Sequence, residues 1–595
     1  MQAGGVDAFL VGSELVALTR VRSSPGVYPA AQALAALAAD VKAKLGAATK
    51  ISYAADWTEY GAHVLGGGAE VRFPLDVVWS SPAVDFVGLD AYWPLSDWRD
   101  GPHLDASEAD DVYDLAYLAR RIGAGEAYDW YYADHAARES QARTPITDGA
   151  YGKPWTFRQK DLVGWWSNAH VERVGGVELP GATGWAARSK PIWIMETGCP
   201  AVDRGANAPN VFPDGKSSEG GLPHFSRGFR DDLMQARFIE ATLARFDSAA
   251  PGFDPACNPV STLYGGRMVD AARIHFWAWD ARPFPAFPDL GILWADAPNW
   301  ETGHWLNGRL EGLALDRLVA ELAAPAIEDG VSAPRPDVRG FVDGYVLDRT
   351  MSARAAIEPL AGAFAFDPVV SGGAVRFSKR GRKAALVLSE DDLVPDRDGA
   401  LVRVTRAQES ELPHEIALTF GEADNDYETA TVLSRRLEGW SQRRSENETA
   451  VMTNRAAAQR IADVWLEDAW MRARDGGVPA RAAGRRRLSP AISSTLPRAR
   501  RRRFVADHAH HGRAVARMSR PRCRSVDLRS RAAGICASRA RKAARAGAAA
   551  RRRARSGDRA QQSDDDAVHR RLRRSVAGRA RRLSQLRRLQ LSIPC

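Results

Sequence analysis

Hydrophobic residues in the first 310 positions form short continuous runs, and each run ends in polar or aromatic residues. Continuous apolar strands are typical of a parallel sheet that helices cover on both faces. Amphipathic stretches between the runs favour helices, so the alternation predicts an α/β fold. The predicted strands are residues 6–12, 50–55, 84–89, 191–195 and 273–278, and the predicted helices are residues 30–45, 106–122, 158–170 and 231–246.

The residues that follow these strands separate two α/β architectures. Polar side chains at the carboxyl ends of successive parallel strands are typical of the active face of a TIM barrel. A doubly wound sheet also alternates, but it usually has a glycine-rich loop after its first strand, and residues 12–28 contain no such loop. We therefore expect a TIM-barrel-like domain over residues 1–323.

The number of strands predicts that this barrel is incomplete. A closed barrel has eight strands, whereas the sequence predicts five of them, equivalent to strands four to eight. We expect the N-terminal third of the barrel to be missing from this chain. An open sheet exposes two strand edges, which predicts aggregation or dependence on the missing segment.

A second module is predicted over residues 338–477, after a proline-rich join at residues 324–338. Its pattern mixes both periodicities and predicts an α+β module. The predicted helices are residues 352–364 and 448–473, and the predicted strands are residues 366–370, 374–378, 383–388, 415–421 and 429–433.

The charge of the chain divides it into two unlike parts. Residues 481–595 hold 33 Arg and one Lys against six Asp and no Glu, whereas the preceding 480 residues are acidic, with a net charge of −19. A basic segment can bind nucleic acid. However, residues 478–595 have no sustained helical or strand periodicity and almost no Lys. We interpret them as a disordered, frame-shifted translation of a GC-rich gene and expect no nucleic-acid partner; a genuine disordered basic tail is the alternative.

The remaining composition predicts few accessory groups. No run reaches the roughly 20 apolar residues of a membrane helix, so we expect no membrane span. Cys199 and Cys257 form no Cys-x-x-Cys or Cys/His motif. We therefore expect neither a metal nor another cofactor.

Two glutamates are the candidate catalytic residues. Glu14 and Glu196 each follow a predicted apolar strand directly, so on a barrel both would project from the same face. Retaining glycoside hydrolysis uses two carboxyl groups roughly 5–5.5 Å apart, of which one donates a proton and the other attacks the sugar. The pair therefore predicts a glycosidase site, although a strand-terminal Glu can equally pair with an Arg or cap a helix.

Aromatic and acidic residues at the same strand ends predict a saccharide-binding surface. Aromatic rings offer flat apolar faces to sugars, and carboxylates can accept hydrogen bonds from sugar hydroxyls. Ordinary packing at the mouth of a barrel remains the alternative for the tryptophans. The candidate substrate-binding residues are Asp56, Trp57, Asp90, Tyr92, Trp93, Trp277, Trp279 and Asp280.

Several long motifs belong together. They are residues 12–15, 51–60, 85–92, 94–101, 190–203, 207–212, 216–219 and 344–377. Those around both glutamates resemble the TIM-barrel-like domain of the gene transfer agent baseplate protein, a phage-tail-derived protein also called a host specificity protein. The module that follows resembles the phage-tail module that comes next in that family.

The resemblance implies a baseplate or tail-tip component of a virion-like particle, assembled in the bacterial cytoplasm. Its implied partners are other tail proteins and a glycan of the host surface. It also implies a barrel related to Glu/Glu glycoside hydrolases, with Glu14 in the acid/base position and Glu196 in the nucleophile position. Those hydrolases usually place Asn before the acid/base residue, and Ser13 stands there in this chain. An active retaining glycosidase on peptidoglycan or surface polysaccharide, and a carbohydrate-binding barrel without catalysis, both remain open.

Overall fold

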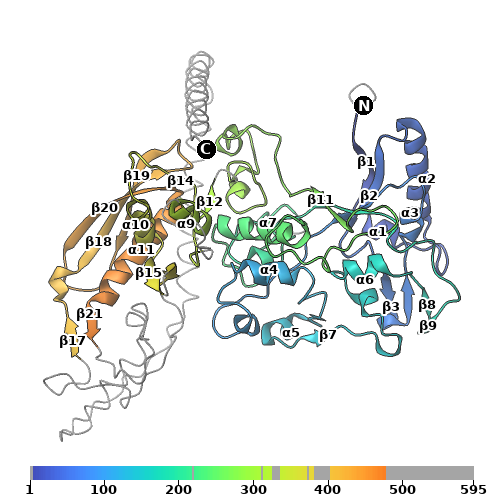
Figure 1. Ribbon diagram of the computed structural model, residues 1–595, viewed down its shortest axis with the longest axis horizontal. Helices are drawn as coiled ribbons and strands as arrows, with labels where there is room; N and C mark the ends of the chain where they lie inside the picture. The colour runs from blue at the N-terminus through green and yellow to red at the C-terminus, as the bar shows by residue number, and fades with distance from the viewer. Residues whose placement is uncertain are drawn as a thin grey trace, which may run out of the picture. The chain divides into compact units, whose positions relative to one another are not determined.

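A five-stranded parallel sheet forms the centre of the N-terminal half in the computed structural model, which describes residues 5–217, 220–309, 312–324, 336–371, 374–380 and 403–477 (Figure 1). The strands are adjacent in the order in which they occur along the chain. This order confirms the predicted TIM-barrel-like α/β fold with five parallel strands. They are β1 (Ala8–Ser13), β2 (Lys50–Asp56), β5 (Val87–Asp90), β10 (Ile192–Glu196) and β11 (Val269–Ile274).

Burial on both faces explains why these segments form strands. Every residue of β2 from Ile51 to Ala55 is buried, and so is all of β5. Helix α2 (Pro29–Leu45) packs against β1 and β2 (Figure 1). Its buried residues, Ala31, Leu34 and Ala38, recur at the helical spacing that places them on one face.

Helix α7 (Asp232–Phe246) contacts β11 and the shorter helix α4 (Leu115–Arg121). Its N-terminus is capped by Asp231, whose side chain accepts a hydrogen bond from the Met234 N–H. The predicted helix over residues 231–246 is therefore confirmed almost to the residue.

Three predicted elements differ from the structure. Strand β11 begins four residues earlier than predicted and ends at Ile274, so residues 275–280 continue beyond the strand. The predicted helix at 106–122 is instead the short turn η2 (Leu104–Ser107) followed by α4. Tyr117 and Arg121 of α4 both donate to the buried Asp105 of η2, which holds the two short elements together. The predicted helix at 158–170 is reduced to α6 (Leu162–Ser167), which Asp161 caps.

Small elements occupy the connections of the large sheet. Strands β3, β4, β8 and β9 form a separate four-stranded sheet, and β6 pairs with β7. The remaining elements of this half are α1 (Val16–Thr19), β3 (His63–Leu65), η1 (Gly66–Gly68), β4 (Glu70–Arg72), α3 (Asp76–Trp79), β6 (Trp130–Tyr131), α5 (His135–Ser140), β7 (Thr144–Pro145), η3 (Gly149–Tyr151), η4 (Pro154–Phe157), β8 (Arg173–Val174), β9 (Val177–Glu178), η5 (Gly205–Asn207), α8 (Ala286–Asp289) and η6 (Ala297–Glu301).

A second hydrophobic core lies in the C-terminal described residues. It joins α9 (Leu315–Ala323), α10 (Ala353–Ala363) and α11 (Arg455–Arg472) to a four-stranded sheet in the order β14-β20-β18-β19. Leu315 and Val319 of α9 are buried in this core, although the sequence assigns residues 315–323 to the first domain. The strands are β12 (Leu313–Ala314), β13 (Phe341–Val342), β14 (Gly344–Tyr345), β15 (Phe366–Ser371), β16 (Ala374–Lys379), β17 (Arg403–Arg406), β18 (Pro413–Glu422), β19 (Glu428–Arg435), β20 (Arg443–Thr453) and β21 (Arg474–Gly477), with the turn η9 (Glu409–Glu411).

Within the described residues, the elements predicted for this module are confirmed except at the start of one helix. The hairpin is confirmed, because β15 and β16 pair antiparallel, and Ser352 caps α10. The predicted helix at 448–473 is wrong over its first six residues, which belong to β20 and pair with β18. Asn454 caps α11 and marks the true start of the helix. The predicted strand at 383–388 and the segment 478–595 lie outside the described residues.

Across the described parts of the chain, no helix combines the length and apolar character needed to cross a lipid bilayer.

Candidate functional site

Three acidic residues lie in a row across the carboxyl ends of the central strands. Asp90 of β5 is in register with Asp56 of β2 on one side and with Glu196 of β10 on the other. Neighbouring strands are roughly 4.8 Å apart, so the three residues are adjacent at one edge of the sheet. Glu14 directly follows β1 at the same edge, since Ser13 is in register with Ala54 of β2.

Asp90 is the centre of this group and is completely buried, with 0% of its surface exposed. Its Oδ2 accepts a hydrogen bond from Ser13 Oγ at 3.0 Å. Burial, reinforced by the charges of Glu196 and Glu14, raises the pKa of Asp90 to about 8. Both predicted catalytic glutamates therefore act electrostatically on one buried carboxyl group.

Glu14 lies on the exposed side of the group. Its backbone adopts a φ of 50°, a left-handed conformation that costs a residue other than glycine roughly 1–2 kcal/mol. Two hydrogen bonds stabilise this turn: Glu14 N–H donates to Ala54 O at 2.9 Å, and Leu15 N–H donates to the hydroxyl of Tyr53 at 2.6 Å. These contacts with β2 thus position the backbone of Glu14, from which its side chain projects.

The residues that support this turn were not predicted from the sequence. Tyr53 is fully buried and donates its hydroxyl hydrogen to Glu59 at 3.0 Å, and Thr19 of α1 also donates to Glu59. Burial raises the pKa of Glu59 above its ordinary value. Tyr53, within an otherwise apolar strand, was the available signal, but Leu15, whose N–H it accepts, is distant in the sequence.

Glu196 is held by an aromatic residue from the neighbouring strand. Tyr92, two residues beyond the end of β5, donates a hydrogen bond from its hydroxyl to Glu196 Oε2 at 3.0 Å. Burial and the charge of Glu196 raise the pKa of Tyr92, so the phenol remains a donor at neutral pH. A phenol that donates to a carboxylate stabilises negative charge on that oxygen.

The predicted aromatic surface divides into exposed and buried rings. Trp277 and Trp279, in the segment after β11, are 48% and 69% exposed, and Trp57 is half-buried. Trp93 is only 3% exposed and packs in the core near Phe246. A ring buried to this extent presents no face to a ligand, so the placement of Trp93 in the binding surface is corrected.

Asp280 is engaged by the protein itself. Arg282 donates to Asp280 Oδ2 at 2.6 Å, and Trp305 Nε1 donates to the same oxygen at 3.0 Å. The hydrogen bonds from Arg282 hold the pKa of Asp280 at about 2. Asp56 likewise has a local role, because its Oδ1 accepts a hydrogen bond from the Thr58 N–H at 2.8 Å. Both carboxylates therefore have partners within the protein: Asp56, at the end of β2, binds Thr58, and Asp280 binds Arg282 and Trp305.

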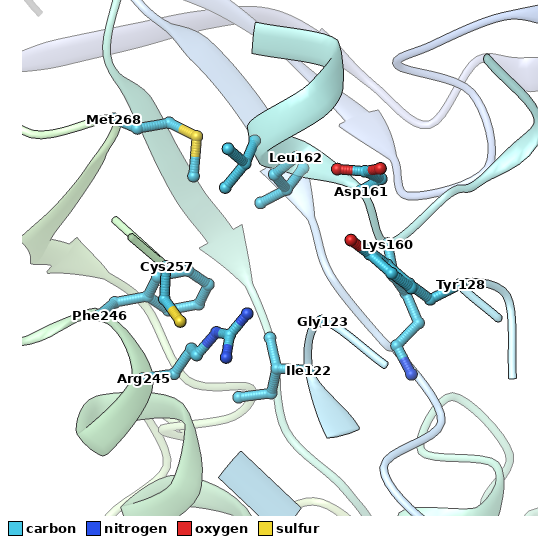
Figure 2. A pocket seen from close by; sticks show the side chains of 11 residues that line it. Ile122, Gly123, Tyr128, Lys160, Asp161, Leu162, Arg245, Phe246, Cys257 and Met268 are labelled. Carbon is cyan, nitrogen blue, oxygen red and sulfur yellow. The ribbon is translucent and has the colours of Figure 1, made fainter. Parts of the chain in front are cut away.

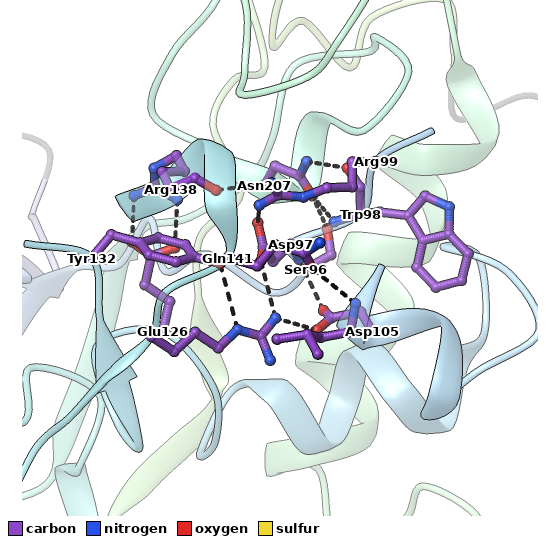
Figure 3. Close-up of polar contacts among 12 residues, drawn as sticks. Ser96, Asp97, Trp98, Arg99, Asp105, Glu126, Tyr132, Arg138, Gln141 and Asn207 are labelled. Atoms are coloured by element: carbon purple, nitrogen blue, oxygen red, sulfur yellow. Dashed lines mark hydrogen bonds and ion pairs between the residues drawn. The ribbon is translucent and has the colours of Figure 1, made fainter. Parts of the chain in front are cut away.

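Two long connections beside the site are joined by a buried polar network (Figure 3). Asn207 binds Trp98 and Ser96, and it also donates to the carbonyl of His224. Asp97 accepts hydrogen bonds from Arg99 at 2.7 Å and from Tyr132 at 2.6 Å. Asn207 therefore joins residues 96–98 to the backbone at His224.

A small pocket of about 40 Å³ lies away from the carboxylate group (Figure 2). Arg245 and Cys257 line one side of it, and Lys160 lines the other. Lys160 is buried, and its amine donates to the carbonyls of Pro94 and Ala124. Met268, which precedes β11, also lines the pocket, so the pocket is near the amino-terminal end of that strand.

Two family models agree with this architecture. Residues 1–288 match the model of the GTA (gene transfer agent) TIM-barrel-like domain, and residues 352–475 match the model of a phage tail protein family. A chain in the solved structure of the virion of a native gene transfer agent particle is 26% identical, with a TM-score of 0.29. The match covers 33% of the present chain and 43% of the virion chain, so the present chain spans less than half of it. A comparison with curated proteins finds no match.

Proposed function

Because the chain belongs to the gene transfer agent tail proteins, with a TIM-barrel-like domain followed by a phage tail domain, we propose a function in contact with the cell envelope. In this proposal, the residues at the carboxyl ends of the central strands bind and cleave a cell-envelope glycan. The protein is a component of a particle tail. We also propose that the protein lies in the baseplate, is assembled in the bacterial cytoplasm and contacts the host envelope. Glu14 and Glu196 form its retaining glycosidase site.

One geometric observation carries the proposal: Glu196 is in register with Asp90, and Glu14 directly follows Ser13, whose hydroxyl donates to the same Asp90 side chain. Two carboxyl groups that lie next to one buried side chain belong to one site, and the charges of both glutamates act on Asp90 in the same direction. Retaining glycoside hydrolysis requires such a pair, together with a difference in protonation between its members.

The surroundings of the glutamates support different roles for them. Tyr92 stabilises negative charge on Glu196, which suits a nucleophile that attacks the anomeric carbon. Glu14 lies on the exposed side, where its carboxyl group can protonate the leaving oxygen. The covalent glycosyl intermediate is then hydrolysed by a water that Glu14 deprotonates, which returns both carboxyl groups to their starting states.

Exposed tryptophans beside the site support a saccharide as the ligand. Trp277 and Trp279 follow β11, the neighbour of β10 that carries Glu196. Large exposed aromatic rings are costly in water, and their flat faces suit the apolar faces of sugar rings. The same surface would serve a carbohydrate-binding domain without catalysis, which is the second candidate function.

Purified cell wall and capsular polysaccharide test the proposal. We expect the full chain to release reducing ends, and Glu196→Gln or Glu14→Gln to lower the rate by at least 100-fold while the glycan still binds. Glu321→Gln, an exposed residue of α9, is the matched control. Binding without release of reducing ends from any polymer would establish the binding function instead.

A purely structural tail role makes the opposite prediction. If particles that carry both Gln substitutions assemble and deliver genes as well as wild type does, neither glutamate takes part in envelope contact. Normal assembly combined with lost delivery would support the glycosidase proposal.

A further inference from the structure

Asp90 has an environment that sets it apart from the two glutamates. It is completely buried at the end of β5, between Asp56 on β2 and Glu196 on β10. A side chain with no exposed surface does not reach a sugar, so Asp90 has a role other than the direct substrate contact that its position in the sequence predicts.

The hydrogen bonding of Asp90 is incomplete. Oδ2 accepts from Ser13 Oγ at 3.0 Å, whereas Oδ1 has no hydrogen-bond partner among the described residues. A buried carboxylate anion usually requires several donors or a nearby cation, because its desolvation costs several kcal/mol otherwise. One hydroxyl donor does not meet this requirement.

The charged groups with the largest effects on Asp90 are acidic. They come from three neighbouring strands or the residues directly after them: Glu14 after β1, Asp56 on β2 and Glu196 on β10. Tyr92 also faces this group, and its hydroxyl donates a hydrogen bond to Glu196.

We infer that Asp90 keeps its proton at neutral pH and acts as a positioning residue, whose neutral carboxyl group allows Glu196 to be ionised beside it. This inference rests on the proposed glycosidase function of the same site. An ionised Asp90 would place a second negative charge next to Glu196 at a position with no exposed surface. The neutral form removes that repulsion and leaves Glu14 and Glu196 to take different protonation states.

Ionisation of Asp90 should end the glycosidase activity at high pH. The pKa of Asp90 lies at about 8, raised by burial and by the neighbouring carboxylates. Above that pH, Asp90 ionises and repels the charge on Glu196. Glycan hydrolysis by the wild-type protein should therefore fall above about pH 8, and Asp90→Asn, which cannot ionise, should remain active at higher pH.

Stability provides a measurement that does not depend on catalysis. A folded-state pKa above the unfolded value of 3.8 means that the folded protein binds the proton more tightly. The melting temperature of wild type relative to Asp90→Asn should consequently decline between about pH 4 and pH 8 and level off above that range. Asp40→Asn, an exposed residue of α2, is the control and should show no such decline.

A second variant covers the case in which Asp90→Asn does not fold. Ser13→Ala removes the hydrogen bond that favours the ionised form of Asp90, and Ser13 is exposed, so folding should persist. We expect the alkaline end of the stability decline to move to higher pH. The experiment measures thermal unfolding of all four proteins from pH 4 to 10 and, where a glycan is cleaved, the pH dependence of the rate.

The results separate this inference from the proposed function. A decline that ends near pH 8 and is absent in Asp90→Asn supports the inference even if no glycan is cleaved. A pH-independent difference between wild type and Asp90→Asn, with no shift in Ser13→Ala, would overturn it, whether or not the chain hydrolyses glycans.

Discussion

Asn207 holds the backbone of Trp98 with both ends of its side-chain amide: Oδ1 accepts from the Trp98 N–H at 3.0 Å, and Nδ2 donates to the Trp98 carbonyl at 2.8 Å. The amide is only 3% exposed and joins the connection that follows β5 to the connection that follows β10 (Figure 3). This contact determines the shape of the loops beside the carboxylate group.

Removal of that amide should loosen both loops. Asn207→Ala leaves the backbone groups of Trp98 and the His224 carbonyl without their partner, so we expect a loss of about 2–4 kcal/mol of stability. Chemical denaturation measures the loss, and limited proteolysis should show earlier cleavage within residues 94–101 or 208–230. Asn168→Ala, an exposed residue with one hydrogen bond to Gly164, is the control; equal losses in the two variants would contradict the role of Asn207.

The hydroxyl of Tyr92 should matter for reaction rate more than for folding. Tyr92→Phe keeps the ring but removes the hydrogen bond to Glu196. A hydrogen bond to a charged group contributes about 1.5–3 kcal/mol, which corresponds to a loss of roughly 10- to 100-fold in hydrolysis of a cleaved glycan. Steady-state kinetics should show the loss mainly in kcat. Tyr131→Phe, at an exposed position, is the control; an unchanged kcat in Tyr92→Phe would argue against Glu196 as nucleophile.

Lys160 should make stability depend on pH in the alkaline range. Burial lowers its pKa to about 7, and in the unfolded chain the amine recovers its ordinary value near 10.5. Between these values the unfolded state binds more protons, so this residue makes stability rise as pH increases from about 7 to 10. Lys160→Met should lack that rise.

Chemical denaturation of wild type and Lys160→Met at several pH values measures this difference, because the contributions of other titrating groups cancel between them. Lys44→Met, an exposed residue of α2, should run parallel to wild type. If Lys160→Met also runs parallel to wild type, the buried amine does not change its protonation on folding.

A single methyl group in the central strand should disrupt the sheet. A Cβ at Gly88 of β5 would lie 2.5 Å from the carbonyl oxygen of Tyr53, and backbone atoms cannot move aside as a flexible side chain can. We expect Gly88→Ala to lose more than about 2 kcal/mol of stability or to be insoluble. Gly362→Ala in α10 has open space around its Cβ and should be neutral or stabilising by up to about 1 kcal/mol. Thermal unfolding compares the two, and a Gly88→Ala protein as stable as wild type would contradict the close packing of β2 on β5.

Local patterns in the sequence were sufficient for the strands of the central sheet and for helices α2, α7 and α10. The apolar run at residues 50–55 and the polar residues after it identified β2, and the capping side chains of Asp231 and Ser352 agree with the starts of α7 and α10. Prediction failed where the structure of a segment depends on a partner that is distant in the sequence. Residues 448–453 have a helix-compatible composition, but they are strand residues because β18 lies beside them.

The sequence by itself determined the order of strands and helices, the α/β class and the two glutamates at strand ends, because these follow from periodicity and from residue type along the chain. Only the tertiary structure decided that Asp90 is buried between Asp56 and Glu196, that Tyr92 binds Glu196, and that Trp93 faces the core. The physical reason is that burial and charge act through space: the register between β2, β5 and β10 brings together carboxyl groups that are far apart in the sequence, and that proximity determines their protonation.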